Sequence, residues 1–439
     1  MDVKESMATY RPKQPPSYDP NDDRYWDGND VLAEEQRQFD VCHGCRLCNG
    51  LCPSFPALFE LTDRIDGEVS KITNEDLRPI EDLCYQCKLC YVACPYTPPH
   101  EFSLDVPRLL MRKKFVTAKT EGVKFKDRVL GDQDRLGKVS SKVAPLVNTA
   151  NNMISNRLIM EKVLGVHRNA SLPKYHGVTF AAWFKKRYGA AMKPSTEPVG
   201  KVAFFHTCTI NYNDPEVGKA CIQVLEKNNI EVVVPEQECC GMPFVDGGDY
   251  SRAHGKMESN LAKLVKWVDE GYDIVAPSPT CSLMLRDEYP TNSPESEAAK
   301  RIAERTFEFG HYLWKLNRAK ILNKEFTKSL GKVNFHVACH TRAQYIGSPS
   351  SLVLAQVPDT TVNAIEQCSA HDGTWGVSKD YHELSLKVGQ KLFNNLQQGE
   401  PSLLVTDCPQ SAMQINHAMG VKPVHTAVAL RDAYGLPRA

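Results

Sequence analysis

Two identical runs of four cysteines constrain this 439-residue chain more than any other feature of its sequence. In each run three cysteines are separated by gaps of two residues, and a fourth follows three residues later and precedes a proline. The runs consist of Cys42, Cys45, Cys48 and Cys52, then Cys84, Cys87, Cys90 and Cys94. This C-x2-C-x2-C-x3-C-P pattern is typical of chains that hold a pair of iron–sulfur clusters.

The same pattern predicts how the cysteines are shared between the clusters, because the fourth cysteine of each run binds the other cluster. We assign the first [4Fe-4S] cluster to Cys42, Cys45, Cys48 and Cys94, and the second to Cys84, Cys87, Cys90 and Cys52. Crossed ligation holds two clusters close together, which suits the transfer of single electrons. Structural zinc fits poorly, since it uses four ligands in two C-x2-C pairs. A disulfide scaffold would be short and secreted.

Length and composition indicate an intracellular protein of several domains. At about 150 residues per domain, the chain has room for two to four. No stretch approaches the roughly 18 uninterrupted apolar residues of a membrane span. The first thirty residues hold several prolines and no signal pattern, so we expect a cytoplasmic protein with an extended N-terminal arm over residues 1–34.

Charge is balanced overall but unevenly distributed. Residues 1–107 hold 10 Lys and Arg against 20 Asp and Glu, whereas residues 108–201 hold 20 against 6. The basic stretch fits either a solvated helical face or a surface that contacts an anionic membrane or an acidic partner. Its basic residues include Arg112, Lys113, Lys114, Lys124, Lys126, Arg128, Lys185, Lys186 and Arg187. No nucleic-acid-binding motif accompanies them, so we expect no nucleic-acid partner.

Beyond residue 200 short apolar runs alternate with amphipathic helices. The pattern predicts strands over 201–205, 231–234 and 273–276, with helices over 215–228 and 257–268. A parallel sheet would place its cysteines just past the ends of the strands, where open α/β sheets bind ligands. The cysteines so placed are Cys208, Cys239, Cys240 and Cys281.

The same order then repeats. Strands expected over 332–337 and 402–406 lead into Cys339 and Cys408, and Cys368 stands where the Cys-Cys pair stood. The separations between matching cysteines are 131, 129 and 127 residues. An internal duplication explains this near-constant offset, and we expect the two halves to be related by a pseudo-twofold axis.

The paired cysteine runs, followed by Cys-x30-Cys-Cys-Gly-x39-Cys and a degenerate copy, resemble the cysteine-rich CCG family of iron–sulfur proteins. Its members include the B and C subunits of heterodisulfide reductase, the iron–sulfur subunit of glycolate oxidase and the C subunit of anaerobic glycerol-3-phosphate dehydrogenase, whose domain order is the most similar. The resemblance implies an α-helical ferredoxin domain followed by a duplicated α/β domain. It also implies a further cluster, of non-cubane type, at Cys208, Cys239, Cys240 and Cys281.

The chain departs from the family pattern in both halves. Met284 stands where a fifth cysteine is expected, and Ser369 and Ser411 replace two more in the second half. Only Cys339, Cys368 and Cys408 remain there, which leaves three interpretations: an empty site, a cluster completed by His340, His371 or Asp372, or zinc bound by three cysteines and a histidine. His336, His340 and His371 are each more often packing residues, and Cys221 reads as a buried structural thiol.

These observations predict an α+β multidomain chain. We expect an arm (1–34), a helical cluster head (35–107), a basic helical linker (108–200), a first half (201–330) and a degenerate second half (331–439). The favoured function is an electron-transfer subunit between a flavin-containing dehydrogenase and a quinone or other carrier. The alternatives are a heterodisulfide or thiol–disulfide reductase and an electron donor to a rubrerythrin-like peroxide reductase. Catalytic residues beyond the metal ligands are not evident.

Overall fold

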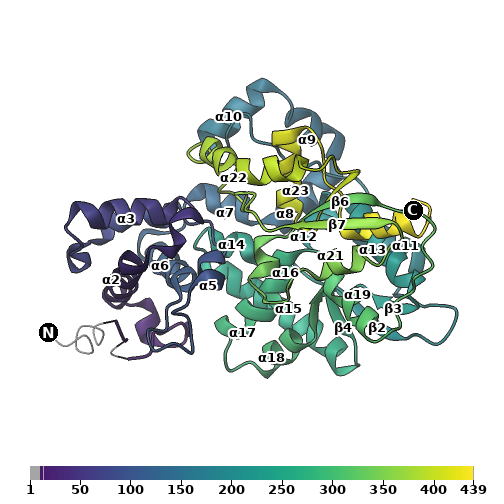
Figure 1. Cartoon of the computed structure of the whole chain (residues 1–439), viewed down its shortest axis with the longest axis horizontal. Coiled ribbons are helices and arrows are strands. Elements are labelled where there is room, and N and C mark those ends of the chain that lie inside the picture. The colour runs from purple at the N-terminus through teal and green to yellow at the C-terminus, as the bar shows by residue number, and fades with distance from the viewer. Residues whose placement is uncertain (1–9, 13, 439) are drawn as a thin grey trace.

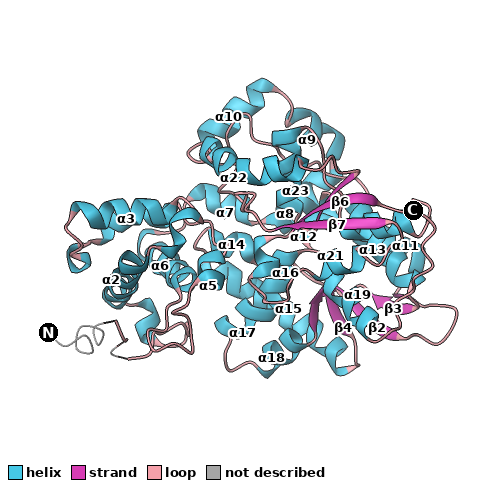
Figure 2. Cartoon of the chain, in the orientation of Figure 1, coloured by secondary structure: helices cyan, strands magenta, loops and turns pink. Residues whose placement is uncertain are grey.

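The computed structural model describes residues 10–12 and 14–438. It contains a helical N-terminal part and two separate β-sheets with helices around them (Figure 1, Figure 2). This arrangement confirms the predicted mixture of a helical head and an α/β remainder.

The cluster head is helical throughout its described residues. Its elements, with the segments that flank it, are η1 (Asp23–Trp26), α2 (Gly28–Cys45), η2 (Leu47–Gly50), α3 (Ser54–Arg64), η3 (Val69–Lys71), α4 (Asn74–Asp82), α5 (Leu89–Ala93) and α6 (Val106–Glu121). A capping box formed by Thr73 and Asp76 begins α4. Phe39, Phe55 and Leu77 form the centre of its apolar core.

The predicted boundary at residue 107 lies inside α6, near its start. Leu110 of α6 belongs to the same apolar core as the helices of the head. The start of α6 therefore packs with the head, whereas Met111 and Phe115 further along it pack in the apolar cluster of the first half. Helix α2 begins at Gly28, within the range predicted for the arm. The part of the arm within residues 1–9 lies outside the described residues.

Two basic residues of α6, Arg112 and Lys113, are not part of an exposed docking face, contrary to the prediction. Arg112 is fully buried, donates from Nε to the carbonyl of Tyr25 at 2.8 Å and pairs with Asp30 at 2.8 Å. Lys113 is buried beside Glu35, with Nζ and Oε2 3.2 Å apart. These side chains lie inside the molecule because carboxylates of the acidic head surround them, so they are not available to a partner.

The rest of the linker forms short helices. They are α7 (Phe125–Gly131), α8 (Gln133–Lys142), α9 (Ala144–Ala150), α10 (Ile154–Leu164) and α11 (Phe180–Tyr188). Gly137 allows α8 to approach the helix that carries Cys208, since a Cβ at this position would lie 2.2 Å from the ring of Tyr212.

The first half is a parallel sheet with one antiparallel edge strand. Its elements are β1 (Ala191–Met192), β2 (Gly200–Phe204), α12 (Cys208–Tyr212), α13 (Pro215–Lys227), β3 (Ile230–Val233), α14 (Met242–Asp246), α15 (Tyr250–Asp269), β4 (Asp273–Ala276), α16 (Pro279–Leu283), the π-helix η4 (Met284–Glu288), α17 (Tyr289–Asn292), α18 (Glu297–Glu304), β5 (Thr306–Glu308) and α19 (Phe309–Arg318). The strand order is β1-β3-β2-β4-β5, and only β1 pairs antiparallel.

The second half repeats this arrangement with fewer strands. It contains β6 (Gly331–His336), α20 (Cys339–Arg342), α21 (Pro349–Leu354), β7 (Thr360–Ile365), α22 (His382–Gln397), β8 (Leu403–Thr406), α23 (Pro409–Met419) and α24 (Thr426–Ala433). Its parallel order β7-β6-β8 matches β3-β2-β4 of the first half. The duplication read from the cysteine spacing is therefore also a duplication of sheet topology.

One apolar core joins the two halves. Val202 and Phe204 of β2 belong to the same buried cluster as Val333 and Phe335 of β6. Burying each such side chain contributes about 1.5 to 3 kcal/mol. The halves therefore pack as one body, and this holds the ends of their strands in a fixed relation.

Candidate iron–sulfur centres

The head brings its eight cysteines together as two sets of four. One cavity is lined by Cys42, Cys45, Cys48 and Cys94, with Phe55 and Phe59 at its side. Another is lined by Cys52, Cys84, Cys87 and Cys90. Each set contains three cysteines of one run and the last cysteine of the other, which is the crossed arrangement that the spacing predicts.

Local backbone geometry explains how the runs turn around these cavities. Arg46 and Lys88 adopt left-handed φ values of 54° and 60°, each within its own run. Arg46 ends α2 directly after Cys45, and Lys88 precedes α5 directly after Cys87. Such a turn redirects the chain between two ligands, so that successive thiols face the same cavity.

The chemistry of these thiols fits a cationic cluster. Burial, with nearby cysteines adding to it, raises the pKa of Cys48 and of Cys52 to about 12. Such thiols keep their protons at neutral pH unless a metal displaces them, because only the thiolate binds metal. Within residues 10–12 and 14–438, no three His, Cys, Asp or Glu side chains could hold a single metal ion. An iron–sulfur cluster distributes its four cysteine ligands over several iron atoms, which suits thiols placed around a cavity.

The four cysteines of the first half meet at the carboxyl ends of three neighbouring parallel strands. Cys208 follows β2, Cys239 and Cys240 follow β3, and Cys281 lies on α16 after β4. The Sγ atoms of Cys208 and Cys239 are 3.8 Å apart, and those of Cys240 and Cys281 are 3.4 Å apart. The predicted first-half set is thus gathered in one place, and all four thiols line one cavity.

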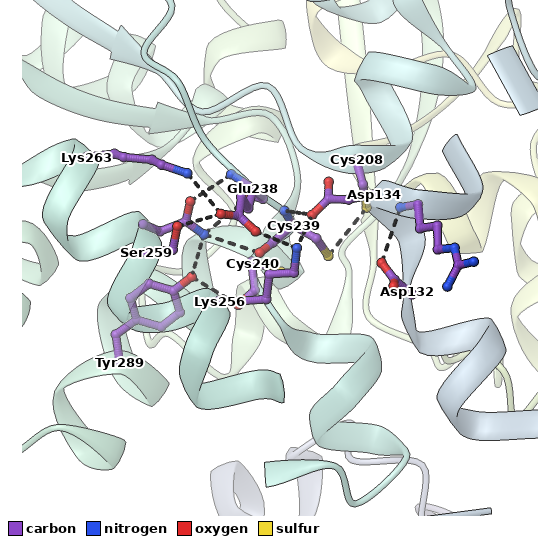
Figure 3. Close-up of polar contacts among 12 residues, drawn as sticks. Asp132, Asp134, Cys208, Glu238, Cys239, Cys240, Lys256, Ser259, Lys263 and Tyr289 are labelled. Carbon is purple, nitrogen blue, oxygen red and sulfur yellow. Dashed lines mark hydrogen bonds and ion pairs between the residues drawn. The ribbon is translucent and has the colours of Figure 1, made fainter. Parts of the chain in front are cut away.

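A network of charged residues supports this set from behind (Figure 3). The backbone N–H of Cys239 donates to Asp134 at 2.9 Å, and Lys256 binds both Asp134 at 2.7 Å and Glu238 at 2.5 Å. Although burial raises the pKa of Glu238, hydrogen bonds from Lys256, Ser259 and Lys263 lower it to about 2. Glu238 is therefore ionised at every physiological pH and holds the residues before the Cys-Cys pair in place.

Tyr289 adds a second support on the other side of the pair. Its hydroxyl donates to the carbonyl of Cys240 at 3.0 Å and accepts from Asn260 at 3.0 Å. The sequence drew attention to none of these residues. The position of Glu238 next to Cys239 could have pointed to it. Asp134 lies in the linker, far from the cysteines in sequence, and nothing in the sequence connects it with them.

The second half opens into the same cavity as the first. Cys339 and Cys408 line it, together with His340, His371 and Asp372. Cys368 is not among the lining residues and instead lies 3.3 Å from the hydroxyl of Tyr85 in the head. The second-half cysteines are therefore divided between the shared cavity and the contact with the head.

The serines that replace cysteines in the second half form a hydrogen bond with each other. Ser369 and Ser411 are buried with their hydroxyl oxygens 2.8 Å apart. In the first half, Met284 is fully buried in the apolar cluster that also contains Cys239, Cys240 and Cys281, and it does not line the cavity. None of the three substitutions therefore presents a polar ligand toward the cavity.

The histidines considered as ligands differ in what they contact. His336 donates from Nε2 to the carbonyl of Gln367 at 3.1 Å and accepts at Nδ1 from Thr406 at 2.9 Å, so it is a packing residue. His340 is similarly occupied, by Gln86 and Thr280. His371 has a buried Nδ1 without a hydrogen-bond partner, and burial lowers its pKa to about 4, so its ring is neutral. Cys221 is fully buried in the core that joins the halves, as expected of a structural thiol.

The second cavity of the head lies against the second half. The ring of Tyr85 packs against that of Trp375 at a tilt of 44°, with centroids 4.7 Å apart, and Trp375 donates from Nε1 to the carbonyl of Asp82 at 3.0 Å. Burial raises the pKa of Cys87, and the nearby thiols of Cys368 and Cys339 raise it further. Cysteines of the head and of the second half are thus close enough to influence each other electrostatically.

Comparison with known families matches this architecture part by part. Residues 35–119 match the Citrate utilization protein B Fer4-like domain, and residues 202–286 and 333–416 each match the CCG cysteine-rich domain. The chain belongs to the CCG-domain iron–sulfur family with an N-terminal Fer4-like domain. Proteins of this family serve as iron–sulfur subunits of oxidoreductase complexes, with a role in electron transfer.

Individual relatives agree with the family. The chain is 30% identical to the C subunit of anaerobic glycerol-3-phosphate dehydrogenase of Escherichia coli strain K12 over 312 residues, which cover 70% of this chain and 76% of that protein. It is 28% identical over 219 residues to lactate utilization protein A 1 of Bacillus cereus strain AH820, covering 47% and 87% of the two chains. Lactate utilization protein A of Bacillus pumilus strain SAFR-032 is 31% identical over 186 residues, covering 40% and 75%.

No helix in the described part of the chain is both long and apolar enough to cross a bilayer.

Proposed function

We propose that this chain is the electron-transfer subunit of a multi-subunit oxidoreductase. It receives electrons from a flavin-containing dehydrogenase subunit and delivers them to a quinone or another carrier, as a cytoplasmic protein that can lie on the inner face of the membrane. Bound iron–sulfur clusters supply one-electron exchange, while the protein sets their positions, surroundings and docking.

The ligands follow from the sets of thiols. Cys42, Cys45, Cys48 and Cys94 would hold the first [4Fe-4S] cluster, and Cys84, Cys87, Cys90 and Cys52 the second. Cys208, Cys239, Cys240 and Cys281 would hold a further cluster in the first half. The buried ion pairs behind Cys239 fix these thiols, and the apolar core shields them from water.

One observation carries the proposal: a cysteine-lined cavity of the head lies beside the second half, two of whose cysteines line a cavity shared with the first half. The contact between Tyr85 and Cys368 joins the second cavity of the head to the second half, whose Cys339 and Cys408 line the cavity that also holds the first-half set. A route of adjacent redox sites is what an electron carrier requires and a purely structural metal protein does not. A pseudo-twofold relation between the halves would account for the shared cavity.

A second candidate function rests on the same cavity. Cysteines from both halves face one space, which would suit a thiol–disulfide or heterodisulfide reductase that cleaves a disulfide there in two one-electron steps. The missing cysteines at 284, 369 and 411 count against it. A rubrerythrin-like peroxide reductase as electron recipient is compatible with the first proposal and changes only the final acceptor.

The experiment that separates these functions uses anaerobically purified, reduced full-length protein. We expect about eight irons from the head plus those of one further cluster, and faster oxidation by soluble quinone analogues than by small disulfides in stopped flow. Cys221→Ala is the matched control, since it removes a buried thiol outside every proposed site and should retain all iron. Fast oxidation by disulfide alone would overturn the proposal in favour of the reductase, and protein without iron or sulfide would overturn both.

A further inference from the structure

Helix α10 has its polarity inverted relative to an ordinary surface helix. It buries Arg157, which is 9% exposed and donates from Nε to the carbonyl of Arg168 at 2.8 Å, whereas Ile154 is 79% exposed. Ile154, Leu158, Ile159 and Val163 are all exposed and fall on one side of the helix. A soluble helix places such side chains against a core, so this face is built to contact something else.

The exposed apolar face continues onto the two preceding helices. The large apolar side chains exposed on α8, α9, α10 and their connections are Val139, Val143, Leu146, Met153, Ile154, Leu158, Ile159 and Val163. We call this set the apolar patch. Helices α9 and α10 lie together at the top of the molecule in Figure 1, away from the cluster head. The opposite side of this region is anchored, since His167 donates from its backbone to Val377 of the second half at 2.8 Å.

The exposed charges carried by the helices of the patch are all basic. Within residues 133–164 the exposed charged side chains are Arg135, Lys138, Lys142 and Lys162. The two acids of this segment face inward or are paired: Asp134 is buried against Lys256, and Glu161 pairs with Arg168. The patch is therefore aliphatic at its centre and basic at its edge.

We propose that the apolar patch rests on the surface of an anionic lipid bilayer. Aliphatic side chains enter the boundary between headgroups and acyl chains, and lysines and arginines reach the anionic headgroups. A protein partner is the weaker fit, because protein interfaces are enriched in aromatic side chains and the patch contains none. The match to known domains ends at residue 119 and resumes at residue 202, so the patch lies in a part of the chain that those domains do not include.

Helix α8 connects the patch to the first-half cysteines, so contact of the patch with a membrane would also position these cysteines. Its inner side carries Asp134, bound to the backbone N–H of Cys239 at 2.9 Å, and its outer side carries Val139 and Lys142. A bilayer against the outer side would bring the shared cavity close to the membrane. This inference rests on the proposed function, because it names the membrane as the place where the electrons leave.

Vesicle flotation tests the inference with the full-length, cluster-loaded protein. Vesicles of phosphatidylcholine with phosphatidylglycerol are compared with vesicles of phosphatidylcholine alone. We expect binding to the anionic vesicles that weakens with added salt, and at least about a tenfold loss of affinity in an Ile154→Ser, Ile159→Ser double variant. A Leu352→Ser, Val421→Ser double variant is the control, since both side chains are exposed outside the patch, and it should bind like the wild type.

Two results would overturn the inference. One is equal vesicle binding by the patch variant and the control. The other is no vesicle binding by the wild type; a concentration-dependent dimer that the patch variant abolishes would then assign the patch to a second copy of the chain. Iron content and the rate of oxidation by a soluble quinone analogue should be unchanged in the patch variant, so failure of membrane binding is distinguishable from failure of the electron-transfer function.

Discussion

The two halves of the α/β module share a strand order but differ in what they place at the ends of their strands. The first half ends three strands in four thiols, with Asp134, Glu238 and Lys256 behind them. The second half ends its strands in three thiols divided between two surroundings, with two serines bonded to each other. A duplicated fold therefore conserves geometry while the chemistry of one copy changes.

The cysteines of the two halves also contact different parts of the molecule. The second half contacts the head through Tyr85 and Trp375, whereas the first half contacts α8 through Cys239. Each half also contacts the other neighbour, since Lys88 of the head pairs with Asp287 of the first half at 3.2 Å and His167 of the linker bonds to Val377 of the second half at 2.8 Å. The halves therefore differ in what surrounds their cysteines: a charged network in the first half, and contacts with the head in the second. This asymmetry leads to four predictions.

The largest effect is expected on metal content. Cys240→Ser should lose the iron and sulfide of the first half and leave about eight irons in the head. We expect Cys408→Ser to leave the iron content unchanged, because the three thiols of its half are one fewer than a four-cysteine cluster requires. Iron and acid-labile sulfide measured on both variants decide the matter, and iron loss in Cys408→Ser would give the second half a cluster of its own.

The next effect is expected in the network that supports the first half. Lys256→Met should lower the free energy of unfolding by about 2 to 4 kcal/mol, because it leaves the buried Asp134 without its cation and Glu238 with Lys263 alone. Lys263→Met is the control, since Lys263 pairs only with Glu238 and is more exposed, and its cost should stay under about 1 kcal/mol. Anaerobic urea unfolding measures both free energies. Equal losses in the two variants would show that the ion pairs of Lys256 do not stabilise the first half.

A pH dependence is expected where the halves meet, at Glu308. Burial raises the pKa of this carboxyl from 4.5 to about 8, with nearby Asp407 adding to the shift. Between these values the folded protein holds the proton and the unfolded chain releases it, so stability falls as pH rises through this window. The slope contributed is at most about 1.4 kcal/mol per pH unit. Glu308→Gln should flatten the dependence of unfolding free energy on pH between 5 and 8, and an unchanged slope would assign it to other groups.

The smallest effect is expected at the serine pair of the second half. Ser411→Ala leaves the hydroxyl of Ser369 buried without its partner, which should cost about 1 kcal/mol of unfolding free energy. Replacing both serines with alanine removes both polar groups and should cost less than the single change. A cost for the double variant greater than that of Ser411→Ala would show that the serines have a role beyond satisfying each other.

Much of the fold could be predicted from local sequence. The predicted strand 273–276 coincides with β4, and the predicted helix 215–228 ends one residue beyond α13. These elements are short apolar runs or amphipathic stretches bounded by proline, glycine or asparagine, so their limits depend on nearby residues. The spacing within each run predicted three cysteines around each head cavity from local geometry, whereas the fourth comes from the other run and was predicted from the known pattern of such chains.

Other features had no local signal. Arg112 and Lys113 read as exposed because charged side chains usually are, yet the carboxylates of the head bury them. The inverted face of α10 has an ordinary composition, and only its packing shows which side faces outward. Asp134 is far from Cys239 in sequence, so no motif could connect them.

The amino-acid sequence by itself determined the kind of chemistry this protein carries, since the number, type and spacing of its thiols restrict the cofactor. It also determined the order of the parts and the duplication, because the cysteine pattern recurs along the chain. Only the tertiary structure decided that both halves open into one cavity, that the second half lies against the head, and that an apolar face of the linker points outward. Those relations join residues more than a hundred positions apart, and they are set by packing across the whole molecule and not by neighbouring residues.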